Sequence, residues 1–335
     1  MSTLTLVLGL LMSGVLQTVY SQTSLQCNAN SKLKRIVIKN PANINQDNCV
    51  YRILPHSSNV CQLLIEFQQF ELEPPTYRAD VHTLECEDHL AVGDFHLCGH
   101  NTGQHLYLPF NVAKGTKEIA LAFSLANRWP QSKWNLVVTQ LECSKANKRM
   151  SFPSLFNMGD NVGLQNMRTL FSAPTFAKTI CPKVNEDILA PAGCNQYYTQ
   201  PTGTIKSFNY QENAASYYLP NMNYVVCIKA GPDATMIEYQ ASKFSMSLEL
   251  PSLPGYDGDC HSYIQTDGRR EDYLMIPQSH VANSVNIVPT YYCGTSLQTR
   301  PSLIASAPFI MYFSSDSFTD ETETGFSINY RIRTA

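Results

Sequence analysis

Apolar residues alternate with polar ones along many short segments of the chain. Between residues 60 and 70, Leu63, Ile65 and Phe67 stand at alternate positions, with mostly polar residues between them. Between residues 119 and 125, large apolar residues alternate with small ones. A period of two places alternate side chains on opposite faces of a strand, so both segments are predicted to be half-buried β-strands.

Short segments of this kind recur in both halves of the chain, separated by turns rich in Gly, Pro and Asn, while helical periodicity is hard to find in the first half. The predicted strands include Cys49–Ile53, Val60–Phe70, Ile119–Leu125, Trp134–Leu141, Asn223–Ile228, Thr235–Tyr239, Pro308–Phe313 and Phe326–Tyr330. Residues 71–80, with two adjacent prolines, are expected to form a loop. Many short strands with frequent turns predict an all-β fold of two antiparallel sandwiches.

A long irregular stretch interrupts this pattern. Residues 144–193 hold few aliphatic runs and are predicted to be a linker, with a short helix near residues 166–171. The expected divisions are therefore residues 22–143 for the first domain and 194–335 for the second. The dibasic pair Lys148-Arg149 has two interpretations, a processing site and, favoured for short charge pairs, solvated linker charges.

Composition places the protein among globular, extracellular chains. Hydrophobic residues make up 44% and charged residues 15% of the sequence, and the net charge of -3 argues against nucleic-acid partners. An apolar run from Leu4 to Leu16, followed by Ser21, predicts a signal peptide at residues 1–21. The run is too short for a membrane span, so we expect a secreted protein.

The eleven cysteines are expected to form disulfides rather than metal sites, because the sequence contains no Cys-x-x-Cys pair. Cys86 and Cys98 bracket a short apolar run, and Gly99 follows the second cysteine. A second version of this stretch begins at Cys260 and ends at Cys293-Gly294. An odd count leaves at least one thiol over.

Several motifs resemble the CUB domain, an extracellular β-sandwich module. In the first half these are Cys49-Val-Tyr-Arg-Ile, Phe67-x-x-Phe-Glu-Leu-Glu73, Cys86-x-Asp-x-Leu-x-Val92, Cys98-Gly99 and Trp134-x-Leu-x-Val. In the second half they are Cys227, Cys260, Cys293-Gly294, Phe313-Ser-Ser-Asp316 and Gly325-Phe-Ser-Ile-Asn-Tyr330. Residues 97–105, 134–143 and 190–197 also resemble arthropod secreted proteins with paired CUB domains.

This resemblance implies a disulfide pattern. It pairs Cys27 with Cys49, Cys86 with Cys98, Cys194 with Cys227, and Cys260 with Cys293. Cys61 and Cys143 then remain in the first copy, and they can form a bridge if their strands are adjacent. Cys181 is left in the linker, either free or joined to a second chain as a covalent homodimer.

Some CUB domains bind calcium, which requires several hard oxygen ligands. The first copy offers Glu73 and Asp88, but Asn127 stands where the third carboxylate is expected. The second copy offers Asp316, but His261 and Ser262 follow Cys260 where an Asp is expected. Neither set is complete, so no cofactor is expected. Calcium binding is the alternative. If no calcium is bound, these carboxylates are expected to cap turns.

Histidines gather around the Cys86–Cys98 pair and offer a second candidate metal site. They are His82, His89, His96, His100 and His105. Imidazoles suit transition-metal ions, but their spacing fixes no pair, so ordinary loop histidines are the favoured interpretation.

The polar loop after Cys98 and the acidic turn at residues 316–323 are the candidate recognition loops, because loops on a rigid scaffold often carry binding. The candidate ligand-binding residues are Asn101, Thr102, Gln104, His105, Asp316 and Asp320. The loop after Cys98 is equally consistent with a structural turn whose Asn and Thr side chains bond their own backbone. Tyrosine doublets such as Tyr217-Tyr218 are expected in the core more than on a binding face.

Signatures of the common enzyme families are missing, including Gly-x-Ser-x-Gly, phosphate-binding glycine loops and His-Glu-x-x-His. The sequence therefore predicts a non-catalytic secreted protein that binds an extracellular protein or carbohydrate. Two alternatives remain open, namely a regulator or accessory subunit of a secreted protease, and a component of venom, seminal fluid or haemolymph.

Overall fold

The structure is a computed structural model. The residues that it describes are 24–41, 47–143, 188–212, 216–247, 272–282, 291–295, 297–298, 302–319 and 323–334. Over these ranges the regular structure is β-strand, apart from one short 3-10 turn, η1 (Val112–Lys114). No helix in this described part is long and apolar enough to cross a membrane. The predicted all-β class is confirmed.

The first sandwich is built from two sheets of five strands. One sheet has the order β1-β3-β12-β5-β10, and the other has the order β2-β4-β11-β8-β9. The strands of the first sheet are β1 (Ser24–Leu25), β3 (Arg35–Lys39), β12 (Lys133–Glu142), β5 (Val60–Glu71) and β10 (His105–Pro109). Those of the second are β2 (Asn30–Ser31), β4 (Asn48–Ile53), β11 (Ile119–Leu125), β8 (Asp88–Val92) and β9 (Phe95–Leu97).

The second sandwich has a matching pair of sheets, ordered β13-β15-β21-β17-β19 and β14-β22-β16-β20-β18. The first contains β13 (Gln196–Tyr198), β15 (Asn223–Ile228), β21 (Ile310–Ser314), β17 (Tyr273–Met275) and β19 (Tyr291–Tyr292). The second contains β14 (Thr202–Lys206), β22 (Gly325–Thr334), β16 (Ala234–Ser245), β20 (Leu303–Ser306) and β18 (Ser279–Val281).

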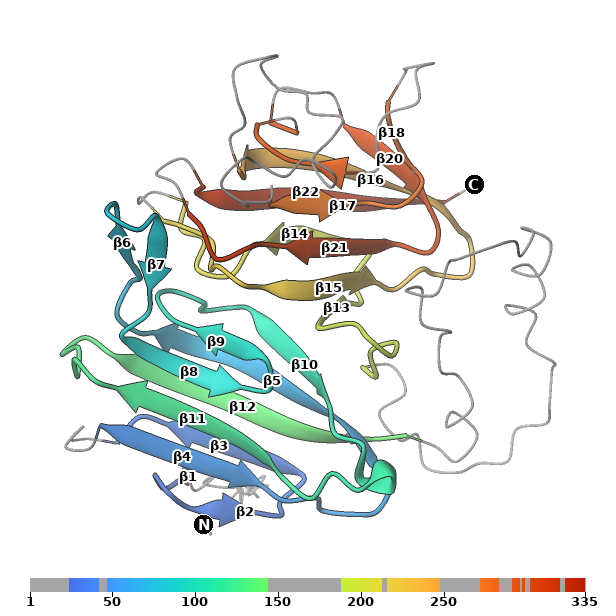
Figure 1. Cartoon of the computed structure of the whole chain (residues 1–335). Coiled ribbons are helices and arrows are strands. Elements are labelled where there is room, and N and C mark those ends of the chain that lie inside the picture. The colour runs from blue at the N-terminus through green and yellow to red at the C-terminus, as the bar shows by residue number, and fades with distance from the viewer. Residues whose placement is uncertain are drawn as a thin grey trace, which may run out of the picture.

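The two sandwiches repeat one topology. The last strand of each half, β12 or β22, lies antiparallel to the long strand β5 or β16. In Figure 1 the first sandwich lies below the second, with β10 and β13 between them. The sheets are antiparallel, as predicted, except at the short edge strands β1, β2 and β13, which pair in parallel with their neighbours.

The core of the first sandwich forms where the predicted alternation places it. Leu121, Phe123 and Leu125 of β11 are buried, whereas the small residues between them are not. The ring of Phe123 stacks on the indole of Trp134 from the opposite sheet, with centroids 4.2 Å apart. This pair fills part of the space between the two sheets and contributes to the close packing of the core.

Four of the predicted disulfides are present, joining Cys27 to Cys49, Cys61 to Cys143, Cys86 to Cys98, and Cys194 to Cys227. Cys61 lies at the start of β5 and Cys143 just after β12, and these two strands are antiparallel neighbours. Cys293 is also disulfide-bonded. Its predicted partner Cys260 lies outside the described residues.

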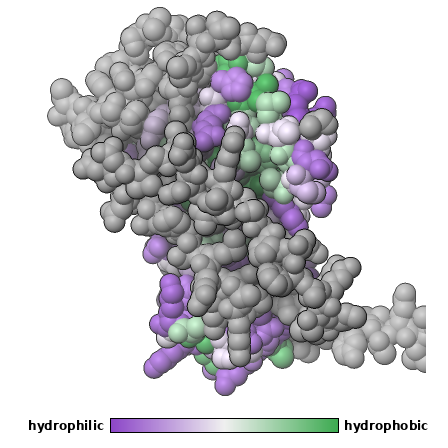
Figure 2. All heavy atoms as spheres, turned by 90° about the vertical axis from the view of Figure 1, so that its right-hand side faces the viewer, coloured by the Kyte–Doolittle hydropathy of each residue, from purple (hydrophilic) through white to green (hydrophobic). Residues whose placement is uncertain are grey.

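Several other predictions fall outside the described residues. These are the signal peptide at residues 1–21, most of the linker with its helix and Lys148-Arg149, and the side chains of Cys181 and Asp320. On the face of the molecule in Figure 2, hydrophilic residues predominate on the described surface of the first sandwich, and a group of hydrophobic residues is visible on the second.

One predicted loop is structured. Residues 71–80 were expected to be irregular, but β6 (Thr76–Arg78) pairs with β7 (Thr83–Glu85) in a hairpin. Arg78 donates a hydrogen bond to Glu85 across this hairpin. The hairpin projects from the first sandwich toward the second (Figure 1).

Replacing Trp134 with alanine is expected to lower the free energy of unfolding of the first sandwich by about 3–5 kcal/mol, because the change leaves a large cavity beside Phe123. Leu33, which is 63% exposed, provides the control, and Leu33→Ala is expected to change stability by less than about 0.5 kcal/mol. Urea unfolding followed by circular dichroism measures both. Equal losses in the two variants would contradict this account of the core.

Candidate functional site: the contact between the sandwiches

The loop from Cys98 to His105 lies between the two sandwiches. Its first residues are tied to the first sandwich, because Leu72 N donates to Gly99 O at 2.9 Å and Gly99 N donates to Glu73 O at 3.0 Å. Thr102 bonds the backbone of Phe70 through its hydroxyl. The loop is thus a fixed part of the first sandwich, and the predicted disulfide Cys86–Cys98 holds its start.

Two asparagines join this loop to the second sandwich. Asn101 is fully buried and accepts a hydrogen bond from Asn209 N to its Oδ1, at 2.8 Å. In return, Asn209 Oδ1 accepts from His100 N at 2.9 Å. The remaining amide groups donate to carbonyl oxygens, Asn101 to Cys98 and Asn209 to Tyr217. Every polar atom of both side-chain amides therefore has a partner.

Gln104 and His105 complete this side of the contact. Gln104 Nε2 donates to Ser207 O at 3.1 Å, and its Oε1 accepts from Gln196 Nε2 at 3.1 Å. His105 Nε2 accepts from Tyr197 N at 2.9 Å. Three of the four loop residues predicted to bind a ligand therefore bond the second sandwich.

The segment that enters the second sandwich packs along the edge of the first. Gln62 bonds both the N–H and the carbonyl of Ala190 through its side-chain amide. Tyr107 donates its backbone N–H to Asn195 O at 2.7 Å and its hydroxyl to Ile188 O at 2.9 Å. The outer edge of β10 is thereby covered, which protects it from pairing with other chains.

A second contact lies at the β6–β7 hairpin. The ring of Tyr77 stacks on Tyr217, with centroids 5.8 Å apart, and Thr319 N donates to His82 O at 2.8 Å. Tyr218, the other member of that tyrosine doublet, is buried in the core, as expected. The two sandwiches are therefore in contact through two separate regions of the first.

Taken together, the predicted recognition loop is occupied by this chain's own second sandwich. Asn101 is buried, and Gln104 and His105 have partners across the contact. Sequence reasoning missed Asn209, because nothing in the neighbouring sequence marks it. The structure gives it a φ of 63°, in the left-handed region that asparagine tolerates. A ligand-binding role for the loop stays a prediction.

The carboxylates of the first sandwich form a hydrogen-bonded turn. Asp88 is fully buried and accepts from Asn127 N at 2.9 Å and from Trp129 N at 2.8 Å. The Asn127 side-chain amide donates to Glu73 Oε2 at 2.9 Å. An amide that donates to a carboxylate places positive partial charge where a calcium ligand needs a lone pair, so this set does not fit calcium as arranged.

The second sandwich has an equivalent cluster built from a residue that sequence reasoning missed. Asp272 precedes β17 as Asp88 begins β8, and its Oδ1 accepts from Asp316 N at 2.7 Å. The hydroxyl of Tyr218 donates to Asp272 Oδ2 at 2.7 Å, and Ser247 donates to Glu323 at 3.1 Å. Burial and the adjacent charge of Asp272 raise the pKa of Tyr218, which keeps it a donor.

An aspartate was expected directly after Cys260, where His261 and Ser262 stand. In the structure, Asp272 occupies the place that corresponds to Asp88. Asp272 stands twelve positions after Cys260, whereas Asp88 stands two after Cys86. The longer connection hid the match from a comparison of spacing. Over the described residues, no group of three or more His, Cys, Asp or Glu side chains is arranged to hold a metal ion.

The five histidines do not converge. His89 and His96 stack on neighbouring strands, with ring centroids 5.4 Å apart, and Nδ1 of His89 lies 3.1 Å from Cys86 O. His82 bonds the hydroxyl of Tyr77. His100 and His105 lie at the contact between the sandwiches. Local hydrogen bonds thus occupy most of them.

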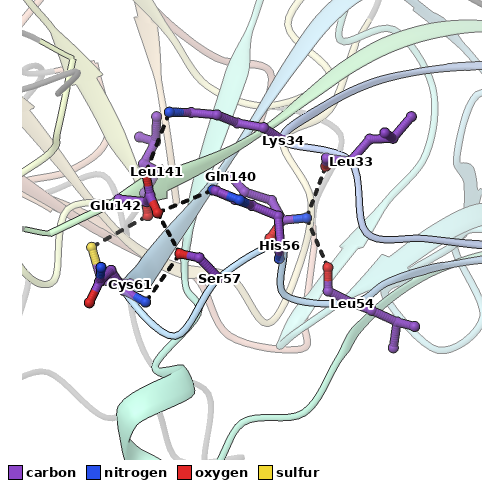
Figure 3. A network of polar contacts seen from close by, with 10 residues as sticks. Leu33, Lys34, Leu54, His56, Ser57, Cys61, Gln140, Leu141 and Glu142 are labelled. Atoms are coloured by element: carbon purple, nitrogen blue, oxygen red, sulfur yellow. Dashed lines mark hydrogen bonds and ion pairs between the residues drawn. The ribbon is translucent and has the colours of Figure 1, made fainter. Parts of the chain in front are cut away.

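One polar network includes serine, histidine and glutamate (Figure 3). The hydroxyl of Ser57 donates to Glu142 Oε1, and His56 Nε2 lies 3.4 Å from the same oxygen. The hydrogen bond from Ser57 lowers the pKa of Glu142, assisted by the charge of His56. Catalysis would require the imidazole to accept the serine proton. Here the Ser57 hydroxyl donates its hydrogen bond to the Glu142 carboxylate, so the arrangement is structural.

The same network anchors the turn before β5. Gln140 is fully buried, and its Nε2 donates to the carbonyls of Leu33 and Leu54 while its Oε1 accepts from His56 N. This buried amide therefore fixes the end of the first sandwich beside the Cys61–Cys143 bridge.

Comparisons with known proteins agree with part of this description. Residues 191–333 match the animal CUB domain family. No curated protein matches the chain by sequence. The predicted resemblance is thus confirmed for the second sandwich. The CUB resemblance of the first sandwich and an arthropod origin stay predictions.

Solved structures similar to the chain include CUB1-EGF-CUB2 domains. Those of rat MASP-1 are 12% identical with a TM-score of 0.29, covering 90% of this chain and 99% of that one. Those of human MASP-1/3 are 12% identical with a TM-score of 0.27, covering 90% and 100%. The MASP-1 CUB2 domain bound to Ca2+ is 19% identical with a TM-score of 0.21, covering 41% and 98%. Values this low carry no conclusion about function.

Two glycines of the loop test the contact. Gly99 has a φ of +65°, and a Cβ there would lie 1.9 Å from Asn209 Oδ1, whereas Gly103 has a φ of +84° and open space around it. Gly103→Ala is expected to cost about 1 kcal/mol from backbone conformation alone. Gly99→Ala adds the displacement of Asn209, so we expect faster hydrogen exchange at the amides of His100 and Asn209 only in that variant. Identical exchange in both variants would contradict the contact.

The hydrogen bond from Asn127 to Glu73 can be tested by the substitution Asn127→Asp. Without calcium, repulsion between the new carboxylate and Glu73 is expected to lower stability by about 1 kcal/mol. Millimolar calcium is expected to restore it, because the new carboxylate then lies beside Glu73, on the turn that Asp88 holds. Both tryptophans, Trp129 and Trp134, lie in this sandwich, so their fluorescence reports its unfolding alone. An unchanged melting temperature with and without calcium in the variant would count against this arrangement.

Proposed function

We propose that this protein is a secreted, non-catalytic binding protein that recognises an extracellular protein or carbohydrate through loops at the ends of its sandwiches. The main support is the match of residues 191–333 to the animal CUB domain, a class that typically mediates protein interactions outside cells. The disulfides add support, because such bridges persist in oxidising compartments.

The turn at residues 126–131 is the best candidate for a ligand-binding loop on the first sandwich. Arg128 is exposed and bonds Asp47, and the turn also carries Trp129, the residue type most enriched at binding hot spots. Asp88 holds the turn by two backbone hydrogen bonds, so it is preorganised. The predicted turn at residues 316–323 remains a second candidate through Asp316 and Asp320.

The loop residues Asn101, Thr102, Gln104 and His105 are weaker candidates, because their side chains bond within the chain. A role as a protease regulator stays open, and it differs from the leading proposal in predicting that a protease copurifies. A role as a component of venom, seminal fluid or haemolymph is the other alternative, and finding the protein in one of these fluids would identify it.

The test uses the full chain, immobilised and exposed both to a glycan array and to extracellular fluid from the producing tissue. We expect saturable binding without chemical change in the bound species. Arg128→Asn combined with Trp129→Ala is expected to weaken binding at least about tenfold, since hot-spot residues carry about 1–3 kcal/mol each. Asparagine is chosen because it tolerates the positive φ of 50° at position 128.

Leu33→Ala is the matched control, because Leu33 is exposed on the same sandwich away from this turn. It is expected to bind like the natural protein. Unchanged affinity in the double variant would remove the turn from the binding site. Turnover of a bound species that disappears on replacing one His, Asp or Ser would overturn the non-catalytic proposal.

A further inference from the structure

His105 is the first residue of β10, at the edge of the first sandwich that faces the second (Figure 1). Its Nε2 accepts a hydrogen bond from Tyr197 N at 2.9 Å. A ring nitrogen can accept only when it carries no proton, so the imidazole is neutral and bears its hydrogen on Nδ1. The contact between the sandwiches therefore depends on the protonation state of this side chain.

Two aromatic rings pack against the imidazole. Its centroid lies 5.0 Å from the ring of Tyr198 and 5.7 Å from that of Tyr107, both edge-on. Removal from water disfavours the charged form, and this burial lowers the pKa of His105 to about 4. Protonation would also place a second N–H opposite the N–H of Tyr197.

The titratable groups on the elements packed around His105 are one carboxyl and several phenols. Glu66 on β5 is its register partner, and the phenols belong to Tyr107, Tyr197 and Tyr198, with Tyr330 of β22 behind Tyr198. Burial raises the pKa values of Tyr107 and Tyr198, so those phenols stay neutral in acid. Glu66 would attract a protonated His105 and partly offset the loss.

Elsewhere in the contact the side chains that bond across it are mainly neutral amides, which do not titrate. They are Gln62, Asn101, Gln104, Gln196 and Asn209. Among these described partners, His105 is the side chain whose hydrogen-bonding role reverses between neutral and mildly acidic pH.

We propose that His105 makes the contact between the two sandwiches acid-sensitive, so that protonation breaks its hydrogen bond to Tyr197 and weakens the hold of the second sandwich on the edge of the first. This inference goes beyond the proposed function, because it concerns how the two halves are held together whatever they bind. In the larger fraction of molecules whose contact opens in acid, the loop at residues 98–105, including Asn101, would be uncovered.

The direction of the effect follows from linkage. The pKa of His105 in the closed arrangement lies below the ordinary value of 6.5, so protons favour the open arrangement. The contribution of His105 is complete above about pH 6.5 and is lost as pH falls toward about 4. Between pH 7 and pH 5 the ratio of closed to open molecules is expected to fall about 20-fold.

Hydrogen exchange of the full chain at pH 7 and pH 5 tests this, using protection factors that correct for the intrinsic effect of pH on exchange. In the natural protein, protection of the Tyr197 amide is expected to fall by about 20-fold between the two conditions. In His105→Gln it is expected to stay constant, because an amide oxygen can accept the same bond without titrating. His96→Gln, an exposed histidine on β9, should retain the fall.

The proposal is wrong if His105→Gln, while still protecting Tyr197 at pH 7, shows the same fall as the natural protein. It is also wrong if the natural protein shows no fall. Should the glutamine variant fail to protect Tyr197 even at pH 7, exchange at the imidazole C–H of the natural protein decides the matter. A pKa for His105 well below that of His96 supports the proposal, and equal values overturn it.

Discussion

The reciprocal hydrogen bonds between Asn101 and Asn209 are the interaction on which the arrangement of this protein depends. Both side chains are buried, at 0% and 1% exposure, and a buried amide without partners costs about 1–3 kcal/mol. Each asparagine accepts a backbone N–H from the opposite sandwich. The fit tolerates little change, because Gly99 has no room for a Cβ beside Asn209.

This contact changes how the molecule is understood as a binding protein. Two sandwiches joined by a long connection would be expected to move independently, as most domains in one chain do. Here the edge of β10, the loop after Cys98 and the β6–β7 hairpin each bond the second sandwich. The surfaces left for a partner are therefore presented in a fixed relation to one another, which lowers the entropy cost of engaging both.

The turns after β11 and β21 are held by buried aspartates in both sandwiches, but the neighbouring carboxylates have different partners. Each sandwich buries an aspartate, Asp88 or Asp272, that accepts the backbone N–H of the turn two residues beyond the central strand. The first sandwich satisfies the neighbouring Glu73 with the amide of Asn127, and the second uses Tyr218 and Ser247 around its carboxylates. In both, hydrogen bonds from backbone and side chains order the turn.

Much of the fold could be predicted because it depends on local signals. The alternation in residues 119–125 fixed β11 to the residue, and the cysteine pattern with its resemblance gave four bridges that the structure contains. The candidate site could not be predicted in this way. Asn101 and Asn209 are over one hundred positions apart, and nothing near either residue shows that it faces the other. Asp272 was missed because a longer connection separates it from its cysteine.

A double-mutant cycle on Asn101 and Asn209 tests the central claim most directly. The free energy of unfolding is measured for the natural protein, for Asn101→Ala, for Asn209→Ala and for the double variant. The account predicts a coupling energy of about 1 kcal/mol or more, because the two residues share hydrogen bonds across the contact. Additive losses, with a coupling energy of zero, would show that the two sandwiches are not held together here.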